Sequence, residues 1–224
     1  MSILSFPYDS EYPKIQSLYK RDKKGKIILE DYSENVFKYL RQAPWEAREK
    51  INGTNIRLDI RINGDNIEYW FKGRAKNSII PEDLLTFLNS LVTKEAINNA
   101  FASDKHRDLY ITIHGEGIGY NIESNLLQLP EGTFDFLVFD IHINVWWLSW
   151  SKVCDICSKL GLKTVPNFGF MTINEAEEIV EKGFKTHTEY NGNAEGIVLV
   201  GVEGILDRHG RRLITKLKTK DYVK

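Results

Sequence analysis

A lysine and three charged residues far from it in the sequence have the types that phosphate chemistry requires. Lys50 precedes a glycine-containing turn in "EKINGTN", residues 49–55. Glu195 starts the apolar segment "EGIVLV", and Lys216 and Lys218 alternate with apolar residues in "ITKLKTK". In a β-strand, residues two apart share one face, so the last two lysines are expected to point the same way. A buried, unpaired carboxylate is costly, so Glu195 is expected to face solvent, a cation or a site.

The chemistry that this set could perform is attack by a lysine amine on phosphorus. An unperturbed lysine has a pKa of about 10.4 and is mostly protonated at neutral pH, so a nucleophilic lysine needs its pKa lowered. Desolvation or neighbouring cations disfavour the ammonium form, and Lys216 and Lys218 could act in this way on Lys50. Taken singly, each residue also has an ordinary structural explanation, such as an edge-strand lysine pair or a strand-end glutamate. The set as a whole favours a site.

Composition is that of an ordinary globular protein. The chain has 224 residues, 42% of them hydrophobic, which is enough for one domain with a substantial core. Cys154 and Cys157 lack the second pair of ligands that a zinc site needs, so they are expected to be structural. No apolar run has the roughly 18 residues of a membrane helix, and the N-terminus does not resemble a signal peptide, so a cytoplasmic protein is expected.

The charge is unevenly distributed along the chain. The net charge is −1, yet residues 14–26 hold six Lys/Arg and one acid and residues 208–224 hold seven and one, so these stretches carry +5 and +6 and the remainder −12. A solvated charged face is the simplest explanation of either stretch alone. If the partner is a nucleic acid, the two stretches are the natural candidates for phosphate contacts.

Periodicity predicts an α+β fold with antiparallel sheets. Alternating segments predict a hairpin of strands 56–62 and 67–72 around Asn63-Gly64-Asp65, and apolar or alternating runs predict four more strands at 108–117, 134–143, 194–201 and 211–220. Helical spacing predicts helices over 81–101, 150–161 and 174–183, the last two closed by glycines. Hairpins outnumber crossover helices, which favours antiparallel sheets over a doubly wound parallel one.

Six elements in chain order resemble the motifs of the covalent nucleotidyltransferase superfamily, which comprises ATP-dependent DNA ligases, RNA ligases and mRNA-capping guanylyltransferases. The first is the lysine motif K-x-[DHN]-G. The six are "EKINGTN", "KGRAKNS", "HGEGIG", "FLVFDI", "EGIVL" and "KLK". The G-T-N after the lysine and the F-D-I of the fourth element are most similar to phage-type ATP-dependent RNA ligases of the RNA ligase 2-like kind. The resemblance implies an antiparallel-sheet, ATP-grasp-like adenylyltransferase domain. The similarity to phage-type enzymes also raises a phage as the source of the protein.

The resemblance also implies roles for individual residues. Lys50 would be the nucleophile that carries AMP, Lys216 and Lys218 would be catalytic and grip the α-phosphate, and Glu195 would bind Mg²⁺ or Mn²⁺. Phe139 would stack on adenine, a use that competes with an ordinary place in a strand, and the neighbouring Asp140 would be a structural hydrogen-bond partner. The full set implied to bind the nucleotide is Glu49, Ile51, Asn55, Arg74, Glu116, Phe139, Glu195, Lys216 and Lys218.

The expected function is ATP-dependent ligation of RNA, or of a nicked duplex containing RNA, by a bare catalytic domain spanning residues 1–224 without an OB-fold. DNA ligases and capping enzymes have aspartate where this chain has Asn52, which disfavours them without excluding them. A minimal DNA ligase, a GTP-using capping-type transferase and a nucleic-acid-binding module without turnover therefore stay open as alternatives.

Overall fold

The computed structural model describes residues 11–75, 78–101, 108–124, 126–202, 205–207 and 209–222. The chain divides into two compact units, each with its own sheet. The first unit comprises Met1–Pro13, Gly53–Asn125 and Leu129–Thr164, and the second comprises Lys14–Asn52, Leu126–Gln128 and Val165–Lys224. One boundary falls inside "EKINGTN", between residues 52 and 53. That the whole chain is a single catalytic domain stays a prediction.

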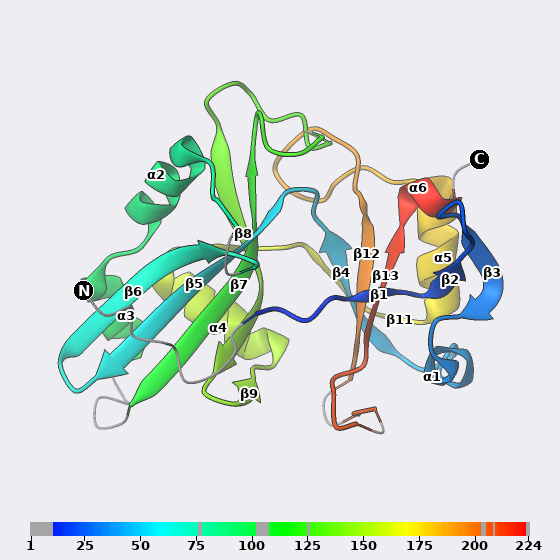
Figure 1. Ribbon diagram of the computed structural model, residues 1–224, viewed down its shortest axis with the longest axis horizontal. Helices are drawn as coiled ribbons and strands as arrows, with labels where there is room; N and C mark the ends of the chain where they lie inside the picture. The colour runs from blue at the N-terminus through cyan, green and yellow to red at the C-terminus, as the bar shows by residue number, and fades with distance from the viewer. Residues whose placement is uncertain are drawn as a thin grey trace. The chain divides into compact units, whose positions relative to one another are not determined.

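A six-stranded sheet forms the first unit, in the order β10-β8-β7-β5-β6 with β9 beside β8. The four long strands lie side by side (Figure 1) and pair antiparallel. The strands are β5 (Thr54–Asn63), β6 (Asn66–Gly73), β7 (Leu109–Gly119), β8 (Phe134–Ile143), β9 (Trp146–Trp147) and β10 (Lys163–Thr164). The predicted hairpin, the predicted strands at 108–117 and 134–143, and the antiparallel α+β class are therefore confirmed. The short β10 is an exception, since it pairs parallel with β8.

Alternation along these strands separates an apolar face from a polar one. Ile56, Leu58 and Ile60 of β5 are fully buried in the core of the first unit. Helices cover this face: α2 (Glu82–Leu91), α3 (Lys94–Ala100) and α4 (Trp150–Leu160) all contribute buried residues to the same core. Because successive strand residues point to opposite faces, the residues between the isoleucines and leucines lie on the other, polar face.

The single helix predicted over 81–101 is wrong, because the structure contains two. Val92, at the end of α2, has extended backbone angles, with φ −128° and ψ 135°. Thr93 is also extended and begins α3, accepting a hydrogen bond on its side chain from the backbone N–H of Ala96. β-branched residues lose side-chain freedom in a helix, and threonine is a favoured N-cap, so these two positions end one helix and begin the next.

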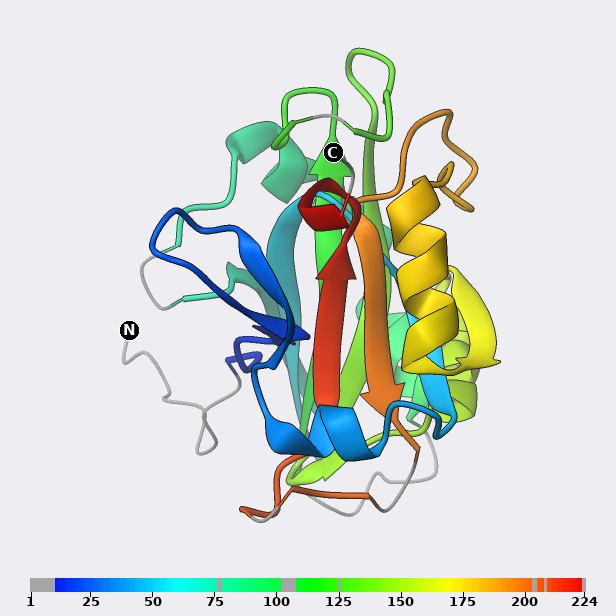
Figure 2. The same cartoon turned by 90° about the vertical axis from the view of Figure 1, so that its right-hand side faces the viewer.

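A five-stranded sheet forms the second unit, in the order β1-β13-β12-β4-β11. Its strands are β1 (Gln16–Ser17), β13 (Ile214–Lys218), β12 (Gly196–Gly201), β4 (Trp45–Lys50) and β11 (Asn167–Met171). Helix α5 (Ile173–Lys182) lies alongside β12 and β13 (Figure 2) and buries Ile173, Ala176 and Val180 in the core of this unit. A separate hairpin of β2 (Tyr19–Arg21) and β3 (Ile27–Tyr32) and the short helices α1 (Asn35–Tyr39) and α6 (Thr219–Tyr222) complete the unit.

Two kinds of difference separate the predicted and observed elements of the second unit. Strands β4 and β11 were not predicted, although β4 carries Lys50 at its end. The last predicted strand, 211–220, is shorter in the structure, where it is β13 and lies between β1 and β12. The helix predicted at 174–183 is confirmed as α5, and α4 ends at Gly161 with a left-handed φ of 69° that glycine adopts without strain. None of the helices in the described ranges has the length and apolarity for crossing a membrane.

Candidate active site

Register across three strands of the second unit brings the predicted lysines onto one rung. Gly196 of β12 pairs with Lys50 of β4 on one side and with Lys218 of β13 on the other. Two residues along, Val198 pairs with Arg48 of β4 and with Lys216 of β13. Residues of one rung, and of rungs two apart, share a face of a sheet. Four basic side chains therefore project from one face, opposite the face that packs against α5.

Glu195 precedes this rung and binds two of the lysines. Its carboxylate accepts hydrogen bonds from Nζ of Lys50 at 2.5 Å through Oε2 and from Nζ of Lys218 at 2.7 Å through Oε1. Its side chain is only 9% exposed. Burial raises the pKa of this carboxyl, but the charges and hydrogen bonds of the two ammonium groups outweigh burial and hold the pKa below its usual range. Glu195 thus faces cations, one of the three environments expected from its sequence.

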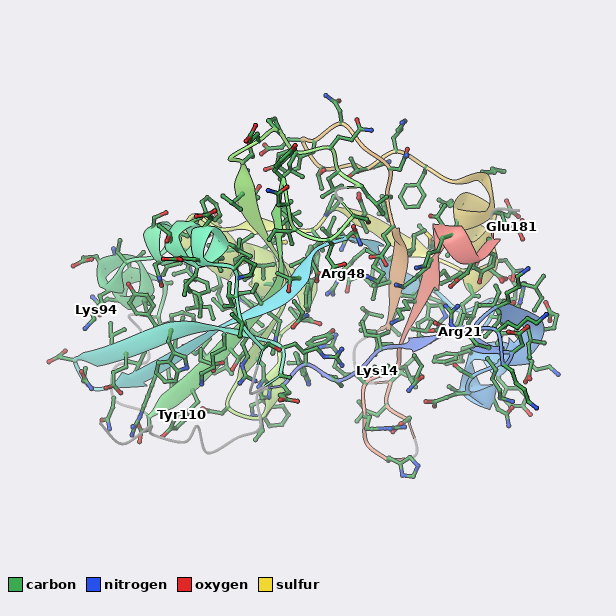
Figure 3. All side chains as sticks on the ribbon, turned by 45° about the horizontal axis from the view of Figure 1, so that its top comes forward. Lys14, Arg21, Arg48, Lys94, Tyr110 and Glu181 are labelled. Atoms are coloured by element: carbon green, nitrogen blue, oxygen red, sulfur yellow. The ribbon has the colours of Figure 1, made fainter. Side chains whose placement is uncertain are left out.

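The amine of Lys216 has a lowered pKa. Burial is the main cause that lowers its pKa to about 8, and the positive charges of Lys50, Lys218 and Lys14 lower it further, while Glu195 opposes them. Lys14 (labelled in Figure 3) precedes β1, the strand that pairs parallel with β13. Ionisable groups with strongly shifted pKa values cluster at functional sites, so this cluster is the candidate active site of the second unit.

Arg48 is a member of the cluster that sequence reasoning missed. Arg48 (labelled in Figure 3) lies two residues before Lys50 on β4 and is 4% exposed. It forms an ion pair of 2.9 Å with Glu46. Asn167 of β11 also donates to Glu46, at 2.8 Å. The signal was present in "WEAREK", where Trp45 and Ala47 alternate with charged residues as in a half-buried strand.

The side chain of Glu49 lies on the opposite face of the sheet from Lys50. It accepts hydrogen bonds from Oγ1 of Thr186 at 2.6 Å and from the backbone N–H of His187 at 2.8 Å. Burial raises the pKa of this carboxyl, while these two hydrogen bonds lower it. These hydrogen bonds connect the end of β4 to the segment after α5. A role for Glu49 in binding a nucleotide stays a prediction. Nothing in the sequence pointed to Thr186 or His187.

Gly196 permits the close approach of β12 and β13. A Cβ atom at this position would lie 2.0 Å from the backbone oxygen of Leu217, which no side chain tolerates. This is the physical reason for a glycine directly after the glutamate in "EGIVL".

The first unit holds a second group of predicted residues. Asn55 of β5 lies directly opposite Glu116 of β7 in the antiparallel ladder, so their side chains share the polar face. Gly53, the glycine of the lysine motif, needs its lack of a side chain, because a Cβ atom would lie 2.4 Å from the backbone oxygen of Gly117. Arg74 follows β6 and is exposed, whereas Ile51, in the second unit, is buried.

Phe139 and Asp140 lie where β8 departs from regular pairing. The register shifts so that His114 of β7 pairs with Asp140 and Gly115 pairs with Val138, which leaves Phe139 as the extra residue of a β-bulge. The ring of Phe139 meets Tyr12 edge-on with centroids 4.9 Å apart and stacks on His114 at 6.4 Å. Asp140 is buried and accepts a hydrogen bond of 2.6 Å from the Tyr12 hydroxyl, which agrees with a structural role.

The donor set fits a hard divalent cation held by one carboxylate. Among the described residues no cluster of three His, Cys, Asp or Glu side chains could hold a metal by itself. Mg²⁺ keeps several waters and binds through one or two carboxylates together with substrate phosphates, so Glu195 alone is an adequate protein ligand. The two cysteines are free thiols of α4, and burial raises the pKa of Cys157 to about 12, which makes it unreactive.

Comparison with known structures defines the class of fold. The chain is similar to a Naegleria gruberi RNA ligase variant solved with ATP and Mn, with a TM-score of 0.58 and 17% identity over 94% of this chain and 62% of that one. The same ligase with pyrophosphate gives the same values. A protein assigned as an Aquifex aeolicus ATP-dependent DNA ligase gives 0.58 and 21%, over 95% of this chain and 50% of that one. The fold is thus that of ligase-type nucleotidyltransferase domains.

The family model of RNA ligases matches residues 43–218, which is more than half of the chain. The chain belongs to the RNA ligase family. A search of curated protein sequences found no match. The chain spans less than two thirds of the length of the ligase structures that it resembles.

Proposed function

We propose that this chain is the catalytic domain of an ATP-dependent RNA ligase that seals a 5′-phosphate to a 3′-hydroxyl. The observation that carries the proposal is that Glu195 binds Lys50 and Lys218, which lie on one rung of the sheet, with Lys216 on the same face. A nucleophilic amine, two further ammonium groups and a carboxylate are the groups that attack on a nucleoside triphosphate needs. The Naegleria ligase variant was solved with ATP and Mn, which supports ATP as the nucleotide. This chain belongs to the RNA ligase family, which supports RNA as the polynucleotide.

The first step is transfer of AMP to Lys50. The unprotonated amine attacks the α-phosphorus of ATP, an N–P bond forms, the bond to the β-phosphate oxygen breaks, and pyrophosphate leaves with that electron pair. The proton lost from Nζ passes to solvent. Lys216 and Lys218 stabilise the negative charge on the α-phosphate during attack. Mg²⁺ or Mn²⁺, held by Glu195, would supply additional positive charge to the phosphates.

The two later steps use the adenylated lysine. An oxygen of the RNA 5′-phosphate attacks the phosphorus of lysyl-AMP, which frees Lys50 and leaves a 5′-adenylated strand. The 3′-hydroxyl then attacks the 5′-phosphorus, a phosphodiester forms and AMP departs. Asn55, Arg74, Glu116 and Phe139 are proposed to hold the nucleotide in these steps. The expected place of action is the cytoplasm, which for a phage-encoded ligase is that of the infected host.

The decisive experiment is labelling with α-labelled ATP and a divalent metal. Wild-type protein should form a covalent adduct and release pyrophosphate, and Lys50→Ala should form none. Cys154→Ser, a change in the free thiols of α4, should label like wild type. An adduct that persists in Lys50→Ala would refute the assignment of the nucleophile. Labelling by GTP in place of ATP would favour a capping-type transferase, and no adduct with either nucleotide would favour a binding module without turnover.

A DNA ligase is the second candidate, because the Aquifex protein is as similar in structure as the Naegleria ligase. The two are separated by nicked duplexes that differ only in the strand carrying the 3′-hydroxyl. An RNA ligase should seal the nick when that strand ends in RNA and seal it poorly when it ends in DNA. Equal or better sealing of the all-DNA nick would replace the RNA proposal with the DNA one.

A further inference from the structure

Ion pairs neutralise part of the positive charge in the two basic stretches. Lys20 pairs with Asp31 at 2.7 Å, and Arg21 forms a two-contact pair with Asp221 of α6. Arg211 likewise pairs with Asp207, at 2.6 Å. These charges are therefore less available to a polyanionic partner than the sequence alone indicates.

Three lysines at the tip of the β2–β3 hairpin, unlike Lys20, Arg21 and Arg211, form no ion pair among the described residues. Lys23, Lys24 and Lys26 are exposed, and among the described residues no carboxylate lies within ion-pair distance of any of them. They fall within four positions of sequence, so three positive charges lie close together at one end of the hairpin. Such a concentration of positive charge attracts phosphates and raises the rate of encounter with a polyanion.

The turn that carries the three lysines is held by a carboxylate. Oδ1 of Asp22 accepts hydrogen bonds from the backbone N–H of Lys24 at 2.8 Å and of Lys26 at 2.9 Å. Gly25, with a left-handed φ of 82°, completes the turn, and its backbone oxygen accepts a hydrogen bond of 2.7 Å from Arg21. Arg21 (labelled in Figure 3) is itself fixed by its pair with α6. Asp22 thus serves as a backbone anchor, and a turn fixed in advance loses little entropy on binding.

We propose that Lys23, Lys24 and Lys26 form a binding surface for the phosphate backbone of the RNA that is to be sealed. The inference rests on the proposed function, which makes a polynucleotide the substrate. Lysine ammonium groups contact phosphates as point charges and position a nucleic acid without reading its sequence. The surface belongs to the same unit as Lys50, and the groups that hold it are distinct from the residues proposed for AMP transfer.

The test removes three charges and compares binding with adenylation. The triple variant Lys23→Gln/Lys24→Gln/Lys26→Gln should form lysyl-AMP at the wild-type rate. Its affinity for a nicked RNA duplex, measured by anisotropy, should fall roughly 10- to 100-fold, and the slope of log K against log salt should decrease by about 2–3, since each phosphate contact contributes roughly 0.9. Sealing at low RNA concentration should slow and recover as RNA is raised.

A matched control has three exposed helical lysines changed in the same way. Lys94→Gln/Lys152→Gln/Lys182→Gln removes equal charge from α3, α4 and α5 and should bind RNA with the wild-type salt slope. Equal slopes for wild type and the hairpin variant, or equal losses in both triple variants, would overturn the proposal. Failure of the proposed function itself would be seen separately, as absence of lysyl-AMP in wild type.

Discussion

The Nζ atom of Lys50 lies 2.5 Å from Oε2 of Glu195, although 145 positions separate the two residues in the sequence. The other oxygen of the same carboxylate binds Lys218 at 2.7 Å. One buried carboxylate therefore fixes the positions of two ammonium groups that extend from different strands. This arrangement makes Glu195 the structural centre of the candidate site and leads to the first prediction.

Glu195→Gln should remove adenylation and lower stability. A glutamine side chain can accept a hydrogen bond from one lysine, but it carries no negative charge. The ammonium groups of Lys50 and Lys218 therefore both lose their counter-charge. We expect adenylation to fall at least about 100-fold and the free energy of unfolding to fall by roughly 1–3 kcal/mol. Label transfer from α-labelled ATP and urea denaturation would measure the two effects. Glu178→Gln, an exposed change on α5, should alter neither.

Lys216→Met should raise thermal stability at neutral pH while abolishing adenylation. The pKa of Lys216 is about 8 in the folded protein, below its value in the unfolded chain. The charge of Lys216 therefore destabilises the fold at any pH at which this lysine is protonated in both the folded and the unfolded state. The melting temperature of the variant should exceed that of wild type most below pH 8. The difference should shrink as the pH rises above 8, because the folded wild type then sheds the proton. A constant difference across pH 6–10 would contradict the assigned shift.

Arg48→Met should weaken ATP binding more than it slows chemistry. Arg48 shares a face with Lys50 and Lys216 but is not the nucleophile, so its loss is expected to raise KM for ATP about tenfold or more, as for a hydrogen bond to a charged group of roughly 1.5–3 kcal/mol. Kinetics of pyrophosphate release would separate KM from kcat. Arg61→Met, near the C-terminal end of β5, is the control. Equal effects of the two changes would indicate that Arg48 has a merely structural role.

Thr186→Val should slow adenylation by displacing the end of β4. The hydroxyl of Thr186 donates to the buried Glu49 at 2.6 Å, and valine has a similar shape without the donor. We expect a loss of about 1–3 kcal/mol in stability and a lower kcat for lysyl-AMP formation. Thr186→Ser keeps the hydroxyl and should restore kcat. If the serine variant is as slow as the valine variant, the hydrogen bond does not position the strand.

Local patterns were sufficient for those elements whose signals lie within a few residues. The alternation of 56–62 and 67–72 around Asn63-Gly64-Asp65 predicted the β5–β6 hairpin, and glycine at 161 marked the end of α4. The helix over 81–101 was wrong because the two extended residues that interrupt it, Val92 and Thr93, occur in a pattern that is helical on both sides. Strand β4 was missed because the charged Glu49 breaks an otherwise regular alternation.

By itself, the sequence determined the identity and order of the chemical groups: a lysine before a glycine turn, a glutamate before an apolar strand, and two lysines on one strand face. These follow from residue type and from the two-residue period of a strand, which are local properties. Only the tertiary structure decided that Gly196 pairs with both Lys50 and Lys218, that Arg48 shares their face, and that Thr186 holds Glu49. Those relations depend on hydrogen-bond register between distant strands and on burial, which no short segment of sequence specifies.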